Sequence, residues 1–278
     1  MGLEIIAGGI EVAGKLFESF GGVIGRRINI KELKKVNDRH IDDIFDLYER
    51  LFKAEHKIPA SDLIAWLQTQ DATEPPEERI QQCLLFAKRK SAVVGMLKAL
   101  YCPQSRYVLV SYLGIDKQSD TISRKVARKM MVSFFARFLN RKWKDSRGIV
   151  FEIETPLPGM VKAEKDECKA RQRLFRDIAT QQNSRALHIK MDYHQPKMAD
   201  EENYAGTGRK MTLMFIPKKH SGDFIAKAIV ENLLKFLLFR VYGTTQTISA
   251  RRKEAYVKYL NSIYNLTVNQ LGDQVDVE

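Results

Sequence analysis

The sequence predicts an α/β protein of the α+β type, with a mixed, mainly antiparallel central sheet, helices on both faces and additional C-terminal helices. Three strand-like runs follow one another with short turns between them, at residues 83–90, 93–102 and 107–116. Such spacing is typical of an antiparallel meander. A long helical pattern at 123–140 separates the third run from a further strand at 148–155. A helix between two strands of one sheet implies a right-handed crossover, so these two strands should be parallel neighbours.

Composition is that of a globular protein with a surplus of positive charge. The 278 residues are 44% hydrophobic and 29% charged, and the formal net charge is +12. These fractions are ordinary for a folded domain. The charge of this basic protein favours an anionic partner, such as a phosphorylated cofactor, nucleic acid or a membrane surface, or it serves solubility alone.

Cysteine and histidine usage excludes several classes of site. The three cysteines (Cys83, Cys102 and Cys168) are odd in number and far apart, which argues against a disulfide framework and for a reducing compartment. The histidines form no metal-binding pattern, so no metal site is expected. Acidic residues interrupt the apolar N-terminal segment, and no clean apolar run approaches the ~20 residues of a membrane span. We therefore expect a cytoplasmic protein without a transmembrane segment.

The N-terminal part is expected to hold one strand and three helices. Residues 1–26 read as a short amphipathic helix, residues 27–36 alternate as a strand does, and residues 61–68 form a further helical pattern. Asn37 or Asp38 can cap the helix after the strand. The apolar face of that helix consists of Ile41, Ile44, Phe45, Tyr48 and Phe52.

Beyond the crossover, helix and strand patterns continue to alternate. Residues 164–180 are helical, 186–193 and 210–219 are strands, and a polar loop joins these two strands. The helix at 123–140 has a buried stripe of apolar residues. Its members are Ala127, Met131, Phe134, Phe135 and Phe138.

The C-terminal part differs in character. Residues 222–241 form a helix that is apolar on most sides, and residues 247–265 form a more basic helix. A helix of the first kind is buried, either on the sheet or on a second copy in a homodimer. We therefore divide the chain into an N-terminal helix (1–26), a core domain (27–220) and a C-terminal helical extension (221–278).

The strand end and helix start at residues 113–131 carry a family resemblance. Leu113-Gly114-Ile115 ends a strand, and a loop and a basic helix follow it. Together with the order of elements from Arg27 to Lys219, this segment resembles the GCN5-related N-acetyltransferase (GNAT) superfamily, as a divergent member. Two of the three small residues of the family's glycine-rich loop are replaced or altered, and the loop is about two residues longer.

The resemblance implies the acyl-CoA N-acyltransferase fold and acetyl-CoA as the cofactor. In the family, two parallel strands splay apart and the acyl-CoA arm lies between them, contacting the first strand at positions matching Tyr112, Leu113 and Ile115. The pyrophosphate sits on the helix N-terminus, where unpaired N–H groups and the helix dipole favour anions. The matching residues are Ser123, Arg124, Lys125, Val126, Ala127 and Arg128. The alternative is a basic, solvated helix face.

The candidate catalytic residues are Glu152, Glu154 and Tyr193. Acetyl transfer to an amine needs a base that takes the amine proton, and a carboxylate can supply it. Glu152 and Glu154 lie two apart on one strand, so they should face the same side. Either could be the base, Glu154 could bind a cationic amine, or both could make surface ion pairs. The family's proton-donating tyrosine aligns with Phe175, which leaves Tyr193 or Tyr112 as substitutes.

Three functional hypotheses follow. The first is an acetyl-CoA-dependent N-acetyltransferase acting on a primary amine of unknown identity. The second is a catalytically inactive acetyltransferase-like domain that serves as an interaction or regulatory module, since Phe175 and the altered loop depart from the family pattern. The third is a nucleic-acid-associated protein, which the charge allows but no interleaved aromatic motif supports.

Overall fold

The computed structural model describes most of the chain. It covers residues 28–35, 37–52, 63–64, 67, 79–116, 120–197, 204, 206–218, 222–244 and 250–277. The predicted N-terminal helix, most of the helix predicted at 61–68 and the turn at 117–119 lie outside these residues.

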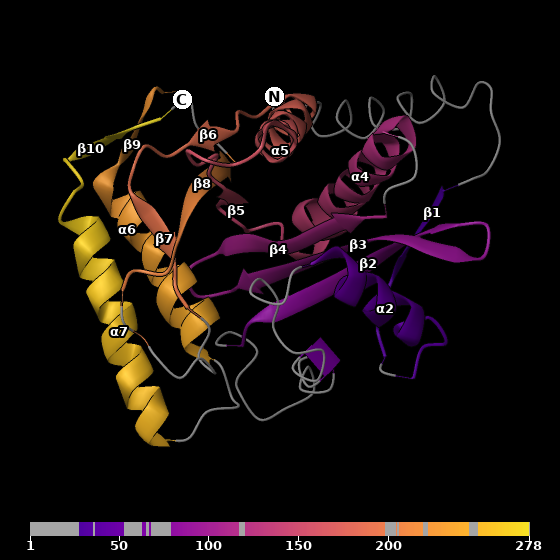
Figure 1. Ribbon diagram of the computed structural model, residues 1–278, viewed down its shortest axis with the longest axis horizontal. Coiled ribbons are helices and arrows are strands. Elements are labelled where there is room, and N and C mark those ends of the chain that lie inside the picture. Colours follow the sequence, from indigo (N-terminus) through magenta and orange to yellow (C-terminus); the bar gives the residue numbers. More distant parts are fainter. Residues whose placement is uncertain are drawn as a thin grey trace, which may run out of the picture.

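An eight-stranded mixed sheet forms the centre of the molecule (Figure 1). Its main path runs β1-β2-β3-β4-β5-β8-β6, and β7 pairs with β8 beside β6. Among the described strands, only β4 and β5 are parallel neighbours, so the predicted antiparallel meander and the parallel crossover are confirmed. The strands are β1 (Ile28–Glu32), β2 (Gln81–Arg89), β3 (Ala92–Cys102), β4 (Tyr107–Ile115), β5 (Gly148–Glu154), β6 (Leu187–His188), β7 (Tyr193–Gln195) and β8 (Arg209–Pro217).

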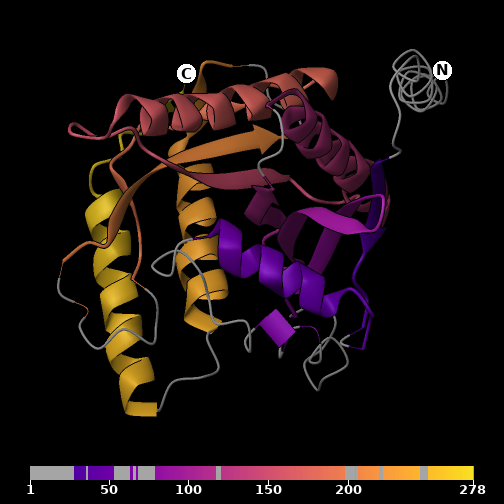
Figure 2. The ribbon, with the colours of Figure 1, turned by 45° about the vertical axis from the view of Figure 1, so that its right-hand side comes forward.

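Helices cover both faces of the sheet, as predicted (Figures 1 and 2). One face packs against α4, its π-helical continuation η3 and α5, through a buried cluster that includes Phe134, Phe151 and Phe175. The other face is covered by α2 over β2, β3 and β4 and by α6 and η4 over β5 and β8. The bounds are α2 (Ile41–Leu51), α4 (Asp120–Phe134), η3 (Phe135–Lys142), α5 (Lys162–Gln181), α6 (Lys227–Lys235) and η4 (Phe236–Val241).

The C-terminal residues share a core with the sheet. Leu233 and Leu237 are completely buried, in one cluster with Val150 of β5 and Leu213 of β8. Packing on the sheet was one of the two predicted positions for this apolar segment. A 3₁₀ turn, η5 (Tyr242–Thr244), follows η4, and α7 (Ala250–Val268) then packs beside α6 and η4.

Two expected elements differ in detail from the prediction. The strand predicted at 186–193 is divided into β6 and β7, each pairing with its own part of β8. The helix predicted from residue 222 begins only at Lys227, because β9 (Phe224–Ala226) pairs with β10 (Gln274–Asp276) from the far end of the chain. Such a pairing depends on a partner about 50 residues away, and no local pattern reveals it.

The parallel strands β4 and β5 part soon after they meet. They pair only from Tyr107 opposite Gly148 to Leu109 opposite Val150. The register of β3 against β4 shifts here, since Ala99 faces Val110 and Lys98 faces Tyr112. Ser111 is therefore an extra residue on β4, and such a bulge bends a strand away from its neighbour. The gap predicted from the resemblance thus exists.

The described part of the chain holds no helix long and apolar enough to cross a membrane. No group of three or more metal-ligating side chains occurs among the same residues.

Candidate active site

A hydrogen-bonded carboxylate lies at the point where β4 and β5 part. Glu152 is two residues beyond Val150, the last residue of β5 that pairs with β4. Because strand side chains alternate, Glu152 projects from the same face as Val150, the face that α6 and η4 cover. Apolar side chains of the C-terminal segment pack on this face, and this packing places two tyrosines next to the carboxylate.

Tyr193 and Tyr242 both donate hydrogen bonds to Glu152. The Tyr193 hydroxyl is 2.5 Å from one carboxylate oxygen, and the Tyr242 hydroxyl is 2.6 Å from the other. Tyr193 starts β7 and is completely buried, whereas Tyr242 starts η5 and is half-buried. The side-chain amide of Gln195 donates in turn to the Tyr242 hydroxyl at 2.7 Å. The carboxylate is thus fixed by a short network that joins β5, β7 and the C-terminal segment.

The environment of this network favours protonated groups. Burial raises the pKa of Glu152 above its ordinary value of 4.5, although the two tyrosine hydrogen bonds act in the opposite direction. Burial and the nearby Glu152 charge raise the pKa of Tyr193 and of Tyr242 well above 10. A carboxylate with a raised pKa is suited to accept a proton near neutral pH.

Tyr112 borders the same network from the β4 side of the gap. Its proximity contributes to the raised pKa of Tyr242. Its ring packs edge-on against Tyr48 of α2 and Phe52, with centroids 5.1 and 4.9 Å away. The buried ammonium of Lys98 lies 5.9 Å from the centre of the ring. Tyr112, one of the residues expected to contact acyl-CoA, is therefore close to the hydrogen-bonded network of Glu152.

Glu154 has a different environment from Glu152. Its carboxylate makes ion pairs with Arg209 of β8 at 2.7 Å and with Arg171 of α5 at 3.1 Å. Burial alone would raise the pKa of Glu154, but the two guanidinium groups outweigh it and the pKa lies below 4.5. The two acids thus have different partners, and Glu154 makes the ion pairs that the sequence left open as an alternative.

Phe175 lies on the opposite face of the sheet from the tyrosines. Its ring stacks on Phe151 with centroids 4.0 Å apart, in the core beneath α5. The position that aligns with the family's tyrosine is thus a packing position here, and the hydroxyl groups near Glu152 come from other elements.

The predicted phosphate turn is described in part. Ser123 donates a 3.4 Å hydrogen bond to the carbonyl of Asp116, and Arg124 and Lys125 are exposed at the start of α4. Arg128 is also exposed and donates to the side chain of Gln181 at 3.1 Å.

The remaining predicted contacts are mostly apolar side chains. Val126 and Ala127 are buried, and because α4 begins at Asp120 they lie beyond the first four residues, whose N–H groups a helix leaves unpaired. The expected contact of these two residues with a phosphate is therefore not supported by their position. Leu113 and Ile115 are half-buried against the core beneath α4.

Sequence reasoning missed Tyr242 and Gln195. Tyr242 is 90 residues from Glu152, and Gln195 is 47 residues from Tyr242. The one available signal was that Tyr242 directly follows the apolar C-terminal helix, whose packing on the sheet was one of two predicted arrangements. Only that arrangement places a residue at 242 over β5.

Within the described sheet, the strands include one parallel pair, β4 and β5, which parts early. The element order and the splayed strands are those that the resemblance implied. The chain has the acyl-CoA N-acyltransferase fold.

No family model and no curated protein matches the chain. Among solved structures it is similar to the diaminobutyrate acetyltransferase EctA from Paenibacillus lautus, solved with its substrate L-2,4-diaminobutyric acid and coenzyme A. That match has 13% identity and a TM-score of 0.45, and covers 71% of this chain and 100% of EctA.

Two further solved structures extend the comparison. An aminoglycoside 6'-N-acetyltransferase complexed with coenzyme A matches at 12% identity and a TM-score of 0.39, over 70% of this chain and 99% of that one. A tandem GNAT protein from the clavulanic acid biosynthesis pathway matches at 12% identity and a TM-score of 0.41, over 85% of this chain and 66% of that one.

Proposed function

We propose that this protein is an acetyl-CoA-dependent N-acetyltransferase that acts on a primary amine, with Glu152 as the general base. The observation that carries the proposal is the Glu152 carboxylate, with its raised pKa, at the parting of β4 and β5. Carboxylates of this kind take protons from attacking groups.

The parted strands fit an acyl-CoA arm. Within the described sheet, β4 continues for six residues beyond Leu109 without pairing to β5, so backbone groups on that side of β4 are open to a bound amide chain. Tyr112, Leu113 and Ile115 lie on this stretch. The basic start of α4, with Arg124 and Lys125 exposed, supplies positive charge for phosphates. When bound, acetyl-CoA supplies the activated acetyl group.

The protein's own groups then act on the acceptor amine. Glu152 would accept a proton from the attacking nitrogen as the new C–N bond forms and the C–S bond of the thioester breaks. The departing thiolate would take up a proton, so that coenzyme A leaves as the thiol. Tyr193 and Tyr242 hold the carboxylate in one orientation through their two hydrogen bonds. Because Tyr193 is completely buried behind Glu152, we assign it a positioning role, which differs from the proton donor expected from sequence.

The tests of this function separate binding from chemistry. Thermal shift with acetyl-CoA should raise the melting temperature, because a ligand that binds only the folded state stabilises it. No shift at millimolar acetyl-CoA would exclude the cofactor. Thiol release from acetyl-CoA with a panel of primary amines then tests transfer.

The second candidate is a domain that binds acyl-CoA without transferring the acetyl group. Phe175 favours it, since this position offers no hydroxyl and is packed on Phe151. This alternative predicts a thermal shift with acetyl-CoA but no amine-dependent thiol release. A homodimer through the C-terminal helices remains a separate proposal, tested by light scattering.

A further inference from the structure

The outer edge of β1 is covered by basic side chains of α4 and η3. Lys129 donates to the carbonyl of Ile28 at 2.7 Å, and Arg137 donates to the carbonyl of Ile30 at 3.2 Å. Because the edge carbonyls are already bonded, this edge is closed to an added strand of another chain. The backbone N–H of Leu33 bonds inward, to the carbonyl of Leu84 of β2. Because backbone groups alternate along a strand, those of Glu32 face the outer edge of the sheet, like those of Ile28 and Ile30.

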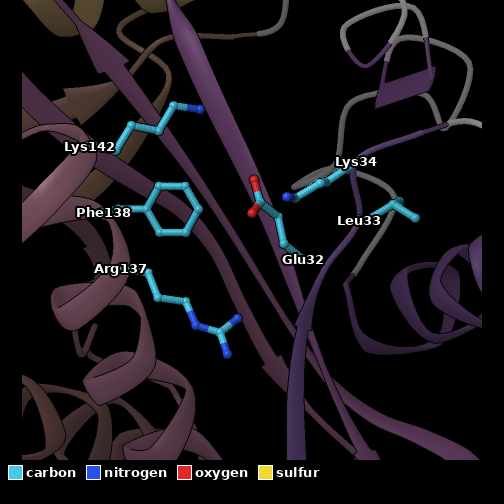
Figure 3. Close-up of a pocket in the computed structure, with 6 residues that line it drawn as sticks. All are labelled: Glu32, Leu33, Lys34, Arg137, Phe138 and Lys142. Carbon is cyan, nitrogen blue, oxygen red and sulfur yellow. The ribbon is translucent and has the colours of Figure 1, made fainter.

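A pocket of about 360 Å³ opens at this third outward position (Figure 3). Its volume is within the range of small-molecule sites. Lys34, at the end of β1, and Arg137 and Lys142, on η3, bring three cations to it, and Glu32 is its single carboxylate. Phe138, which is 2% exposed, and Leu33 supply apolar walls.

The charges of the pocket are not neutralised within it. Among the described residues, no ion pair joins Glu32 to any of the three cations. Figure 3 shows the ends of Arg137 and Lys142 on one side of Glu32 and the end of Lys34 on the other. The lining therefore carries a net charge of +2, from three cations and one carboxylate.

The π-helical winding of η3 builds this arrangement. In an α-helix, residues five apart point about 140° away from each other, at about 100° per residue. A π-helix bonds residue i to i+5 and turns by only about 82° per residue, so residues five apart differ in direction by about 50°. The amide of Trp143 bonds to the carbonyl of Phe138, five residues earlier, at 2.6 Å. Arg137 and Lys142 are also five apart, and both line the pocket. Segments of π-helix are rare and frequently mark functional sites.

We propose that this pocket binds a small dianion, either free phosphate or a phosphomonoester, at a site distinct from that of acetyl transfer. A phosphomonoester carries a charge of about −1.5 to −2 at pH 7, which matches the lining. The planar guanidinium of Arg137 and the ammonium of Lys142 suit phosphate oxygens. Glu32 can accept a hydrogen bond from a hydroxyl or amine on the same ligand.

The site is remote from Glu152. Strands β2, β3 and β4 lie between β1 and β5, which separates the two strands by about 19 Å at ~4.8 Å per strand. The inference therefore stands independently of the proposed acetyltransferase activity.

Titration of the full chain with inorganic phosphate at low ionic strength, by calorimetry, tests the proposal. Lys142→Gln should weaken binding by about five-fold or more through the lost charge-assisted contact. Glu32→Gln should instead tighten it, by about three-fold, because it removes a repelling charge. These opposite signs are not expected from damage to the fold, and melting curves of each variant check that it is folded.

Arg141→Gln is the matched control. Arg141 is exposed on the same π-helix and does not line the pocket, so its loss should change the affinity by less than about two-fold. Equal losses in Lys142→Gln and Arg141→Gln would overturn the proposal in favour of general surface attraction. So would binding that Lys125→Gln abolishes and Lys142→Gln leaves intact, since that result places phosphate at the start of α4.

Discussion

The hydroxyl of Tyr242 donates a 2.6 Å hydrogen bond to the carboxylate of Glu152, across 90 residues of sequence. This contact connects the C-terminal segment to the centre of the sheet. Residues after 222 therefore complete the site at the parted strands, in addition to covering the sheet.

Tyr242→Phe should shift the pH dependence of acetyl transfer. The hydroxyl stabilises the charged carboxylate, so its removal raises the pKa of Glu152 further. The acidic limb of kcat/KM should move to higher pH, with a loss of about ten-fold below that limb. A pH–rate profile measures this. An unchanged limb with a uniform loss would indicate that Tyr242 is structural only.

Glu152→Gln should lower activity and, at neutral and higher pH, raise stability. Loss of the base should lower kcat by about 100-fold or more. The pKa of Glu152 is higher in the folded protein than its ordinary value of 4.5. The free energy of unfolding of the wild type therefore falls as pH rises above 4.5, because the unfolded chain releases this proton more readily. The neutral glutamine avoids this loss, so the melting temperature of the variant relative to wild type should increase from pH 4.5 to pH 8. A constant difference across this range would contradict the raised pKa.

Glu154→Gln should behave in the opposite way. The ion pairs with Arg209 and Arg171 lower the pKa of Glu154, so their stabilisation is present above pH 4.5 and is lost as pH falls below it. Because Arg171 is about half exposed, solvent screens part of the attraction, and we expect a cost of about 0.5–1 kcal/mol at pH 7. Urea denaturation at pH 7 and pH 3.5 measures the cost. Transfer should change by less than about three-fold, and a loss as large as that of Glu152→Gln would reassign the base.

Gly148→Ala should destabilise the start of the parallel strand pair. A Cβ at this position would lie 2.6 Å from the backbone carbonyl oxygen of Ile216, which cannot move without shifting β8. We expect a loss of about 2 kcal/mol by urea denaturation. Gly272→Ala is the control, since its nearest contact would be an ordinary 3.5 Å, and it should stay within about 0.5 kcal/mol of wild type. Because Gly→Ala lowers the entropy of the unfolded chain and so favours folding, similar losses in both variants would contradict a clash specific to Gly148.

The sheet could be predicted because its signals are local. Alternation and short turns identified β2, β3 and β4, and the helical stripe at 123–140 implied the parallel crossover to β5. Glu152 was found for the same reason, as a charged residue on an otherwise apolar strand.

The rest depends on contacts between distant segments. The Glu152–Tyr242 bond requires the C-terminal segment to lie on one particular face of the sheet. The π-helix at Phe135–Lys142 stands where an α-helix was expected. It forms one side of the basic pocket, and the other side is the end of β1, about 100 residues earlier in the chain. Neither the position of the C-terminal segment nor the π-helix can be predicted from a local sequence pattern.

Amine-dependent release of thiol from acetyl-CoA, compared between wild type and Glu152→Gln, tests the central claim most directly. Acetyl-CoA should raise the melting temperature of both proteins by the same amount. Only the wild type should release thiol when a panel of primary amines is added. Equal release by the two proteins would contradict the role of Glu152, and no release by the wild type with any amine would contradict the transferase itself.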